Sequence, residues 1–178
     1  QYLVHKSESE VTVIDKNNHH NLDKLNDDAK ASKKFKRIIA DLSKIESFKL
    51  LDDDYDEVYM LAALVGVNRT LKRPDEVILV NSLLVTNTLN WLSKSSIKKL
   101  LYTSSSENYA GTSDLFDVDI PTSETVPLCI SDIKHPRWTY ALTKMLGESA
   151  FIHFANRYNF DCTIVRYQNI IGPEMGFG

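Results

Sequence analysis

The sequence predicts an α/β protein with a doubly wound parallel sheet. Short runs of apolar and β-branched residues alternate along the chain with longer amphipathic segments, which is typical of a parallel sheet covered by helices. Each predicted strand also ends in a polar or small residue. Because ligands bind at the carboxyl edge of an open parallel sheet, these endings indicate a ligand site at that edge.

Five segments are predicted to be strands because they are short, apolar and rich in β-branched or aromatic residues. In chain order they are residues 11–14, 37–40, 57–61, 98–103 and 161–166. Residues 75–93 are predicted to form a helix, since apolar side chains recur there near a 3.6-residue period. A second helix is predicted over residues 138–158, with Pro136 as a start signal.

The composition excludes several classes of function. The 178 residues carry a net charge of −3 and scattered lysines, so no surface for nucleic acid or for a membrane is expected. No apolar stretch reaches the roughly 20 residues that span a bilayer. Cys129 and Cys162 are too isolated for a disulfide framework, which favours a reducing, cytoplasmic location.

No metal site is predicted. His19 and His20 are adjacent in the polar segment 16–32, which predicts a surface loop with a short helix. Adjacent side chains do not converge on one ion in a helix or a strand, so these histidines are interpreted as solvated loop residues.

A tyrosine and a lysine stand one helical turn apart in the second predicted helix. Tyr140 and Lys144 have the i, i+4 spacing that places both side chains on one helix face. A hydroxyl-rich run, residues 104–107, follows the fourth predicted strand and projects from the ligand edge of the sheet. A second pair with the same spacing, Tyr2 and Lys6, precedes the first predicted strand and has no such partner, so it is rejected.

These residues have the chemistry of a redox site for alcohols. The ordinary tyrosine pKa of about 10 makes the phenol a poor base, but a nearby ammonium lowers it. Tyr140 is therefore predicted to take an alcohol proton while hydride leaves for a nicotinamide, with Ser105 holding the same oxygen. Glu107 supplies a possible second acid or base.

The other strand ends supply candidate cofactor ligands. Asp15 stands where an acidic side chain accepts hydrogen bonds from an adenosine ribose diol, which favours NAD over NADP, although it also fits a plain loop start. Asp41 and Leu42 are placed to flank an adenine. Residues 61–63, Leu-Ala-Ala, allow close approach of a cofactor or pack in a core. Asn81 is predicted to bond the neighbouring strand end, or else to lie on the helix surface.

Motifs along almost the whole chain together resemble one protein family. They are Asp15, residues 60–63 (Met-Leu-Ala-Ala), Asn81, residues 103–109 (Thr-Ser-Ser-Ser-Glu-Asn-Tyr), residues 136–144 and residues 166–173 (Arg-Tyr-Gln-Asn-Ile-Ile-Gly-Pro). The sequence resembles the extended short-chain dehydrogenase/reductase family, and more narrowly its nucleotide-sugar epimerases, dehydratases and decarboxylases. The resemblance implies a partial Rossmann-like domain, NAD as cofactor, a UDP- or dTDP-linked hexose as substrate, and a homodimer.

The resemblance also implies roles for individual residues. Tyr140 is the expected base that works through a transient 4-keto sugar, Lys144 its activator and ribose ligand, and Ser105 its hydroxyl partner. The other residues expected to act on substrate or cofactor are Ser106 and Glu107, which occupy the positions of the dehydratase Asp-Glu or decarboxylase Ser-Glu pair, Asn169 for the sugar nucleotide, and Leu61, Ala62, Ala63, Ser104 and Tyr167 for the cofactor.

Some features depart from the family pattern. Met60 replaces the usual His, and Ala110 is inserted after Tyr109. No glycine-rich turn precedes Val11, so the phosphate-binding loop is expected outside these residues, as is the C-terminal substrate lobe. We therefore expect residues 1–178 to be a single domain truncated at both ends, and to be inactive by itself.

Two other functions remain open. A catalytically inactive Rossmann-like scaffold or regulatory subunit would keep the fold and lose cofactor binding, but retention of Ser105, Tyr140 and Lys144 argues against such loss. A simple alcohol dehydrogenase that releases NADH is the third hypothesis. The sequence does not identify the sugar.

Overall fold

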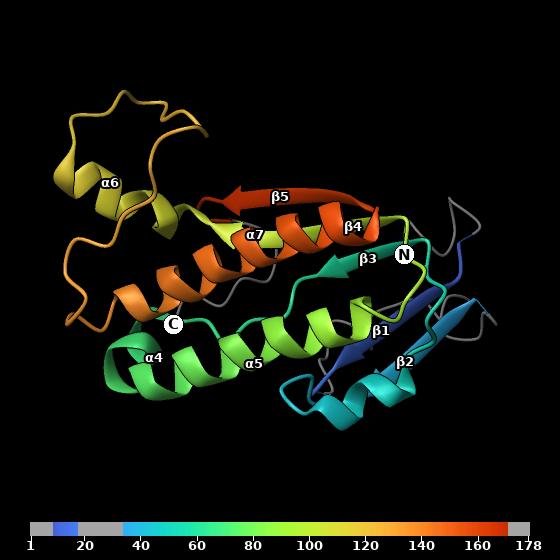
Figure 1. Ribbon diagram of the computed structural model, residues 1–178. Coiled ribbons are helices and arrows are strands. Elements are labelled where there is room, and N and C mark those ends of the chain that lie inside the picture. Colours follow the sequence, from blue (N-terminus) through green and yellow to red (C-terminus); the bar gives the residue numbers. More distant parts are fainter. Residues whose placement is uncertain (1–8, 18–33, 171–178) are drawn as a thin grey trace. The chain divides into compact units, whose positions relative to one another are not determined.

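The computed structural model describes residues 9–17 and 34–170 (Figure 1). The chain separates into two compact units, residues 1–52 and 53–178, and each is described here by itself. The prediction of one domain over residues 1–178 stays a prediction. The Tyr2–Lys6 pair, His19 and His20 lie outside the described residues.

In the described part of the first unit, residues 9–17 and 34–52, two parallel strands pair. β1 (Val11–Asp15) pairs with β2 (Phe35–Ile39) in a register that sets Val11 against Phe35 and Asp15 against Ile39. β2 begins two residues before the predicted segment because the Val11 N–H donates to the Lys34 carbonyl at 2.7 Å, which brings Phe35 into the pairing. The short helix η1 (Ile45–Leu50), which the sequence did not predict, follows.

As far as the chain is described, up to residue 170, the second unit is built on a three-stranded parallel sheet. Its strands, in spatial order, are β3 (Glu57–Met60), β4 (Lys99–Ser105) and β5 (Asp161–Tyr167). β4 runs two residues beyond the predicted end because Ser104 pairs with Arg166 and Ser105 with Tyr167. Serines favour turns in isolation, but this tertiary pairing holds them in the strand. The predicted parallel α/β fold is confirmed.

Two long helices lie side by side along one face of this sheet (Figure 1). α5 (Pro74–Leu92) begins with proline, which suits the first helical turn because it lacks an N–H. α7 (Trp138–Tyr158) is capped by Asn159, whose left-handed φ of 58° turns the chain so that the Phe160 N–H also donates to the Ala155 carbonyl, at 3.2 Å. The residues buried between these helices and the strands include Val77, Leu84, Val85, Leu92, Leu100, Tyr102, Ala141 and Phe151.

Three short helices at the ends of β3 and β4 were not predicted from the sequence. They are α4 (Val67–Lys72), η2 (Ser106–Tyr109) and α6 (Ala110–Leu115). Each is too short for its hydrophobic period to stand out. Ala110, the inserted residue, opens α6, and a side chain at Gly111 would overlap the Cys129 backbone. In the part of the chain that is described, no helix is long and apolar enough to cross a membrane.

Gly147 sets the distance between α7 and β4. A Cβ atom at this position would overlap the buried ring of Tyr102, which packs against Phe151 with ring centroids 4.8 Å apart. We expect Gly147→Ala to lower the free energy of unfolding by about 1–3 kcal/mol, because overpacking outweighs the better helix propensity of alanine. Thermal unfolding checks this, with Ser149→Ala on the exposed side of α7 as control. A Gly147→Ala midpoint equal to that of the control would refute the packing constraint.

Candidate active site

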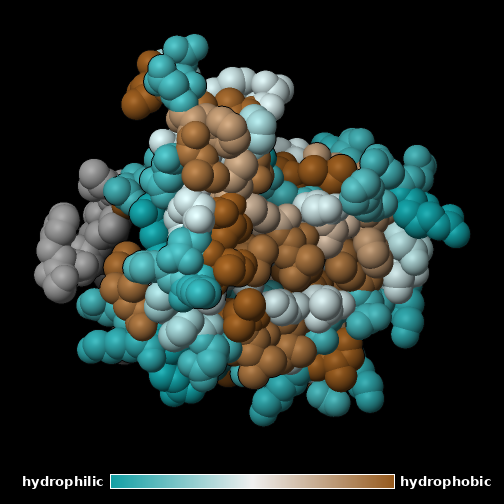
Figure 2. Space-filling model, turned by 60° about the vertical axis from the view of Figure 1, so that its left-hand side comes forward, coloured by the Kyte–Doolittle hydropathy of each residue, from teal (hydrophilic) through white to brown (hydrophobic). Residues whose placement is uncertain are grey.

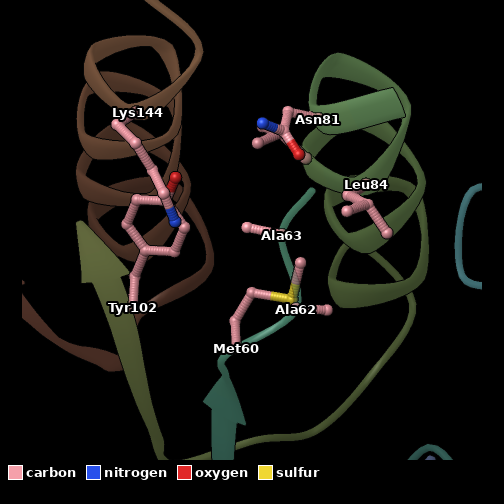
Figure 3. A pocket seen from close by; sticks show the side chains of 8 residues that line it. Met60, Ala62, Ala63, Asn81, Leu84, Tyr102 and Lys144 are labelled. Atoms are coloured by element: carbon pink, nitrogen blue, oxygen red, sulfur yellow. The ribbon is translucent and has the colours of Figure 1, made fainter. Parts of the chain in front are cut away.

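The predicted site residues of the second unit gather at the carboxyl ends of its strands. Ser105 ends β4, and Tyr140 and Lys144 lie one turn apart in the first half of α7. Beside them is a small pocket between the strand ends and the two helices. Figure 3 shows Tyr102 and Lys144 on one side of this pocket, Asn81 and Leu84 on the other, and Ala63 between them.

Lys144 is a buried lysine held by the sheet. Its side chain is 4% exposed, and its Nζ donates to the carbonyl oxygen of Thr103 at 2.6 Å. The same nitrogen lies 5.0 Å from the ring centroid of Tyr102 and 5.7 Å from that of Tyr140. Burial lowers the pKa of Lys144 from 10.5 to about 8, so the ammonium is still the main form at neutral pH.

Tyr140 is half-buried and lies beside Ser105. Burial raises the pKa of its phenol above 10, the hydrogen bond with the Ser105 side chain lowers it, and the charge of Glu107 raises it. The net shift is upward, which is opposite to the lowering predicted from Lys144. The reason is that desolvation of the phenolate dominates, while the Lys144 ammonium is bonded to the Thr103 carbonyl.

The residues after β4 form a capped turn at this edge. The Ser105 hydroxyl accepts a hydrogen bond from the Glu107 N–H at 3.2 Å and so caps η2, which Ser106 begins. The Glu107 carboxylate accepts a hydrogen bond from Nε of Arg137 at 3.1 Å, just before α7. The structure thus brings Ser105, Ser106 and Glu107 to the edge where Tyr140 lies.

Ser104 points away from this edge, into the interface between the sheet and α7. Its hydroxyl donates to Oε1 of Glu148 at 2.5 Å and accepts from Nδ2 of Asn108 at 3.0 Å. Arg166 completes the cluster by donating to both oxygens of the same carboxylate. The Ser104 hydroxyl therefore bonds Glu148 and Asn108 in this structure. The predicted contact between Ser104 and the cofactor stays a prediction.

Glu148, Asn108 and Arg166 were missed by the reasoning from sequence. One signal was available for Glu148, because it lies four residues after Lys144 and so shares its helix face. Arg166 stood out as a charge at the end of an apolar strand. No sequence pattern linked Glu148 to Arg166.

Asn81 joins the segment that follows β3 to α7. Its Oδ1 accepts from the Leu64 N–H at 2.7 Å, and its Nδ2 donates to the Leu64 carbonyl at 3.1 Å and to Oγ1 of Thr143 at 3.3 Å. Asn81 thus bonds the segment that follows β3 rather than the strand end itself, and its contact with a cofactor stays a prediction. Ala62 and Ala63 line the pocket, whereas Leu61 is 60% exposed; their contacts with a cofactor stay predictions.

The remaining predicted ligands end their strands as expected. Asp15 is the last residue of β1, and its Oδ1 accepts from the Asn17 N–H at 2.8 Å. Asp41 follows β2, and hydrogen bonds from the hydroxyl and backbone of Ser43 lower the pKa of its carboxyl. Leu42, half-buried, comes next. These residues belong to the first unit, so their convergence with Tyr140 stays a prediction.

Tyr167 and Asn169 lie at the end of β5 and just beyond it. Both are exposed, as residues that meet a ligand from this edge need to be. Among the described residues, no group of three or more histidine, cysteine or acidic side chains is placed to hold a metal ion.

A parallel α/β unit with a serine, a tyrosine and a buried lysine at the carboxyl edge of its sheet is typical of the α/β proteins that bind a ligand at that edge. The chain belongs to the NAD dependent epimerase/dehydratase family, whose sequence model matches residues 1–177. NAD is accordingly the cofactor of its family.

Individual relatives agree with this assignment. The UDP-N-acetyl-alpha-D-glucosaminuronate decarboxylase of Bacillus cytotoxicus is 35% identical over 125 residues, covering 70% of this chain and 36% of its own length. The UDP-glucuronate 4-epimerase of Thermodesulfobacterium geofontis is 29% identical over 146 residues, covering 81% of this chain and 42% of its own length.

A solved structure shows the same fold. The UDP-N-acetylglucosamine 4-epimerase from Methanobrevibacter ruminantium M1, in complex with UDP-N-acetylmuramic acid, superposes with a TM-score of 0.69 at 28% identity, covering 94% of this chain and 49% of that one. The chain therefore spans about half the length of this structure, and less than half of the two curated relatives.

The burial of Lys144 predicts a pH-dependent stability. Because its pKa falls from 10.5 to about 8 on folding, the unfolded chain binds one more proton between these values. The free energy of unfolding of the unmodified protein, relative to Lys144→Met, should therefore rise with pH in this window by up to about 1.4 kcal/mol per unit, and be level below pH 8.

Denaturant unfolding of both proteins without cofactor, from pH 7 to 10.5, measures this difference. Lys94→Met removes an exposed lysine and is the control, for which the difference should stay level. A level difference for Lys144→Met as well would show that Lys144 is not desolvated.

Proposed function

We propose that the protein containing this chain is an NAD-dependent enzyme that acts on a nucleotide sugar through a transient 4-keto sugar, as an epimerase, a dehydratase or a decarboxylase. The observation that carries the proposal is the placement of Ser105, Tyr140 and buried Lys144 together at the carboxyl edge of a parallel sheet. The family membership of the chain supports it.

The residues of the chain suit NAD at this edge. Ala62 and Ala63 are small and line the pocket next to Lys144, so their side chains do not block the approach of a ligand to the backbone at this edge. The Lys144 ammonium donates one hydrogen bond to Thr103, and its other two N–H groups suit a ribose diol. When bound there, NAD would supply the hydride acceptor for oxidation of the sugar and the hydride donor for its later reduction.

Tyr140 is the proposed base. Its phenol holds a proton in the cofactor-free structure because burial raises its pKa. The positive charge of Lys144 favours the phenolate, and bound oxidised NAD would add a second positive charge nearby; the phenolate then takes the proton of the 4-hydroxyl while the sugar is oxidised. Ser105 holds the same oxygen, and the proton returns from Tyr140 when the ketone is reduced.

The reactions that follow the 4-keto sugar need other groups. Ser106 and Glu107 are proposed as the second acid or base that acts on carbons next to the ketone, and the hydrogen bond from Arg137 to Glu107 supports this role by holding the carboxylate near Tyr140's edge of the sheet. Asn169, with Tyr167 at the nicotinamide, is proposed to contact the nucleotide sugar. A UDP- or dTDP-linked hexose is the proposed substrate, because the relatives described above are named for UDP-sugars.

Replacing the base tests the proposal. Tyr140→Phe in the full-length protein should lower kcat by at least about 100-fold while leaving the Kd for NAD unchanged, because the phenol oxygen carries the proton but little cofactor affinity. Kinetics and calorimetric NAD titration measure the two effects, with Tyr158→Phe at the far, exposed end of α7 as control. Retained activity in Tyr140→Phe would reject the assigned base.

Mass analysis of the product separates the three reactions. Loss of water indicates a dehydratase, loss of carbon dioxide a decarboxylase, and unchanged mass with altered stereochemistry an epimerase. If the full-length unmodified protein binds no dinucleotide, a non-catalytic scaffold replaces this proposal, and if NADH accumulates with turnover, a simple alcohol dehydrogenase does.

The homodimer is proposed on the exposed apolar side chains of the two long helices. Leu79 and Leu83 on α5 are 61% and 36% exposed, and Leu142 and Leu146 on α7 are 37% and 43% exposed. Figure 2 shows apolar side chains gathered in a broad band across one face of the molecule. Burying such a surface against a second copy would remove it from water.

Light scattering tests this assembly. Leu146→Glu should convert a dimer to a monomer, because it would place a charge in the interface, whereas Leu115→Glu on α6, at a site 54% exposed, should not. A monomeric unmodified protein, or a Leu146→Glu variant that stays dimeric, would reject these helices as the interface.

A further inference from the structure

We propose that Glu148, paired with Arg166, is a positioning residue that holds the Ser105 to Glu107 turn in register with Tyr140. This inference rests on the proposed function, since it assigns Ser105 and Tyr140 to one reacting oxygen. Glu148 itself does not lie at the reacting edge, because its carboxylate is buried under β4.

A single carboxylate ties together the three elements that carry Ser105, Glu107 and Tyr140, which are β4, η2 and α7. Glu148 stands on α7, the helix of Tyr140 and Lys144. Its Oε1 accepts from Oγ of Ser104 on β4 at 2.5 Å and from Nδ2 of Asn108 on η2 at 2.7 Å. The turn that Ser105 caps is thereby anchored to α7 through Asn108, which is fully buried.

Arg166 adds β5 and a more distant segment to the same cluster. Its Nε and Nη2 donate to the two Glu148 oxygens at 2.9 Å and 2.7 Å, a two-point geometry that fixes both side chains. Its Nη1 donates to the Tyr109 hydroxyl at 2.8 Å and to the Glu124 carbonyl at 3.2 Å. Arg166 therefore links the far end of η2, and the segment that leads to α7, to the Glu148 carboxylate.

Burial and charge explain why this cluster fixes geometry. Glu148 is 6% exposed, and although burial opposes ionisation, hydrogen bonds from Arg166 and Ser104 hold the pKa of its carboxyl below the ordinary value. A buried ion pair contributes little net stability compared with an apolar pair of the same size, because both charges lose their hydration. The ion pair instead fixes the relative positions of α7, β4, β5 and η2, because its four short hydrogen bonds are compatible with one arrangement of these elements.

The arrangement matters for the proposed chemistry at Ser105. Its hydroxyl position depends on the end of β4 and on the turn of η2, and both are held by Glu148. A displacement of about 1 Å in a group that orients the reacting oxygen can lower a rate by about 100-fold. Lys144, the proposed cofactor ligand, is held separately by the Thr103 carbonyl. The affinity for NAD should therefore not change when the Glu148 cluster is disrupted.

Glu148→Gln in the full-length protein tests this separation. We expect kcat to fall by about 10- to 100-fold, with the KM for the sugar nucleotide and the Kd for NAD within about twofold of the unmodified values. Glu57→Gln, which removes an exposed carboxylate from the far end of the sheet, is the matched control and should leave kcat unchanged. Unchanged kcat in Glu148→Gln would overturn the proposal.

A double variant guards against simple loss of folding. Glu148→Met combined with Arg166→Met removes both charges, so no unpaired charge is left in the interior and the unfolding midpoint should recover relative to Glu148→Gln. If the cluster positions Ser105, kcat stays low despite this recovery. If kcat recovers together with stability, the cluster is merely structural and the proposal is wrong.

Amide hydrogen exchange gives a readout that does not depend on turnover. Peptides covering residues 105–110 should exchange faster in the double variant than in the unmodified protein and in Glu57→Gln, because η2 loses its anchor to α7. If the unmodified protein binds no NAD and converts no sugar nucleotide, the proposed function fails, while unchanged exchange in the double variant rejects the anchoring role of Glu148.

Discussion

The alternation of side-chain direction along β4 is the constraint on which the second unit depends. Successive residues of a strand face opposite sides, so Tyr102 and Ser104 point to α7 while Ser105 remains at the ligand edge. Pairing with β3 and β5 on both sides fixes this register. A slip by one residue would place Ser105 under the helix and Ser104 at the edge.

The elements with strong periodicity were predictable from the sequence. The long helices α5 and α7 lie within one residue of the predicted ranges at both ends, because their apolar side chains repeat over several turns. The strands were located through their β-branched runs, and their ends differ by one or two residues because partner strands set those limits. The placement of Tyr140 and Lys144 on one helix face followed from the same periodicity.

Tertiary pairing accounts for what the sequence did not reveal. Ser104 and Ser105 are neighbours of the same type, and their hydrogen bonds distinguish them: the Ser104 hydroxyl donates to Glu148 on α7, whereas the Ser105 hydroxyl accepts from the Glu107 amide in the local turn. The direction of the Tyr140 pKa shift depends on burial, which a motif does not encode. The Glu148–Arg166 pair joins residues 18 positions apart on different elements, a distance at which no local rule applies.

Two charges on one face of α7 are neutralised by different partners. Lys144 and Glu148 have the i, i+4 spacing at which a lysine and a glutamate often pair on a helix surface. In the described structure they form no ion pair with each other: Lys144 bonds the Thr103 carbonyl, whereas Glu148 bonds Arg166. An ion pair between them would occupy the ammonium and raise the pKa of the lysine. Because Arg166 satisfies the carboxylate instead, the Lys144 ammonium keeps donors for a ligand at the edge of the sheet.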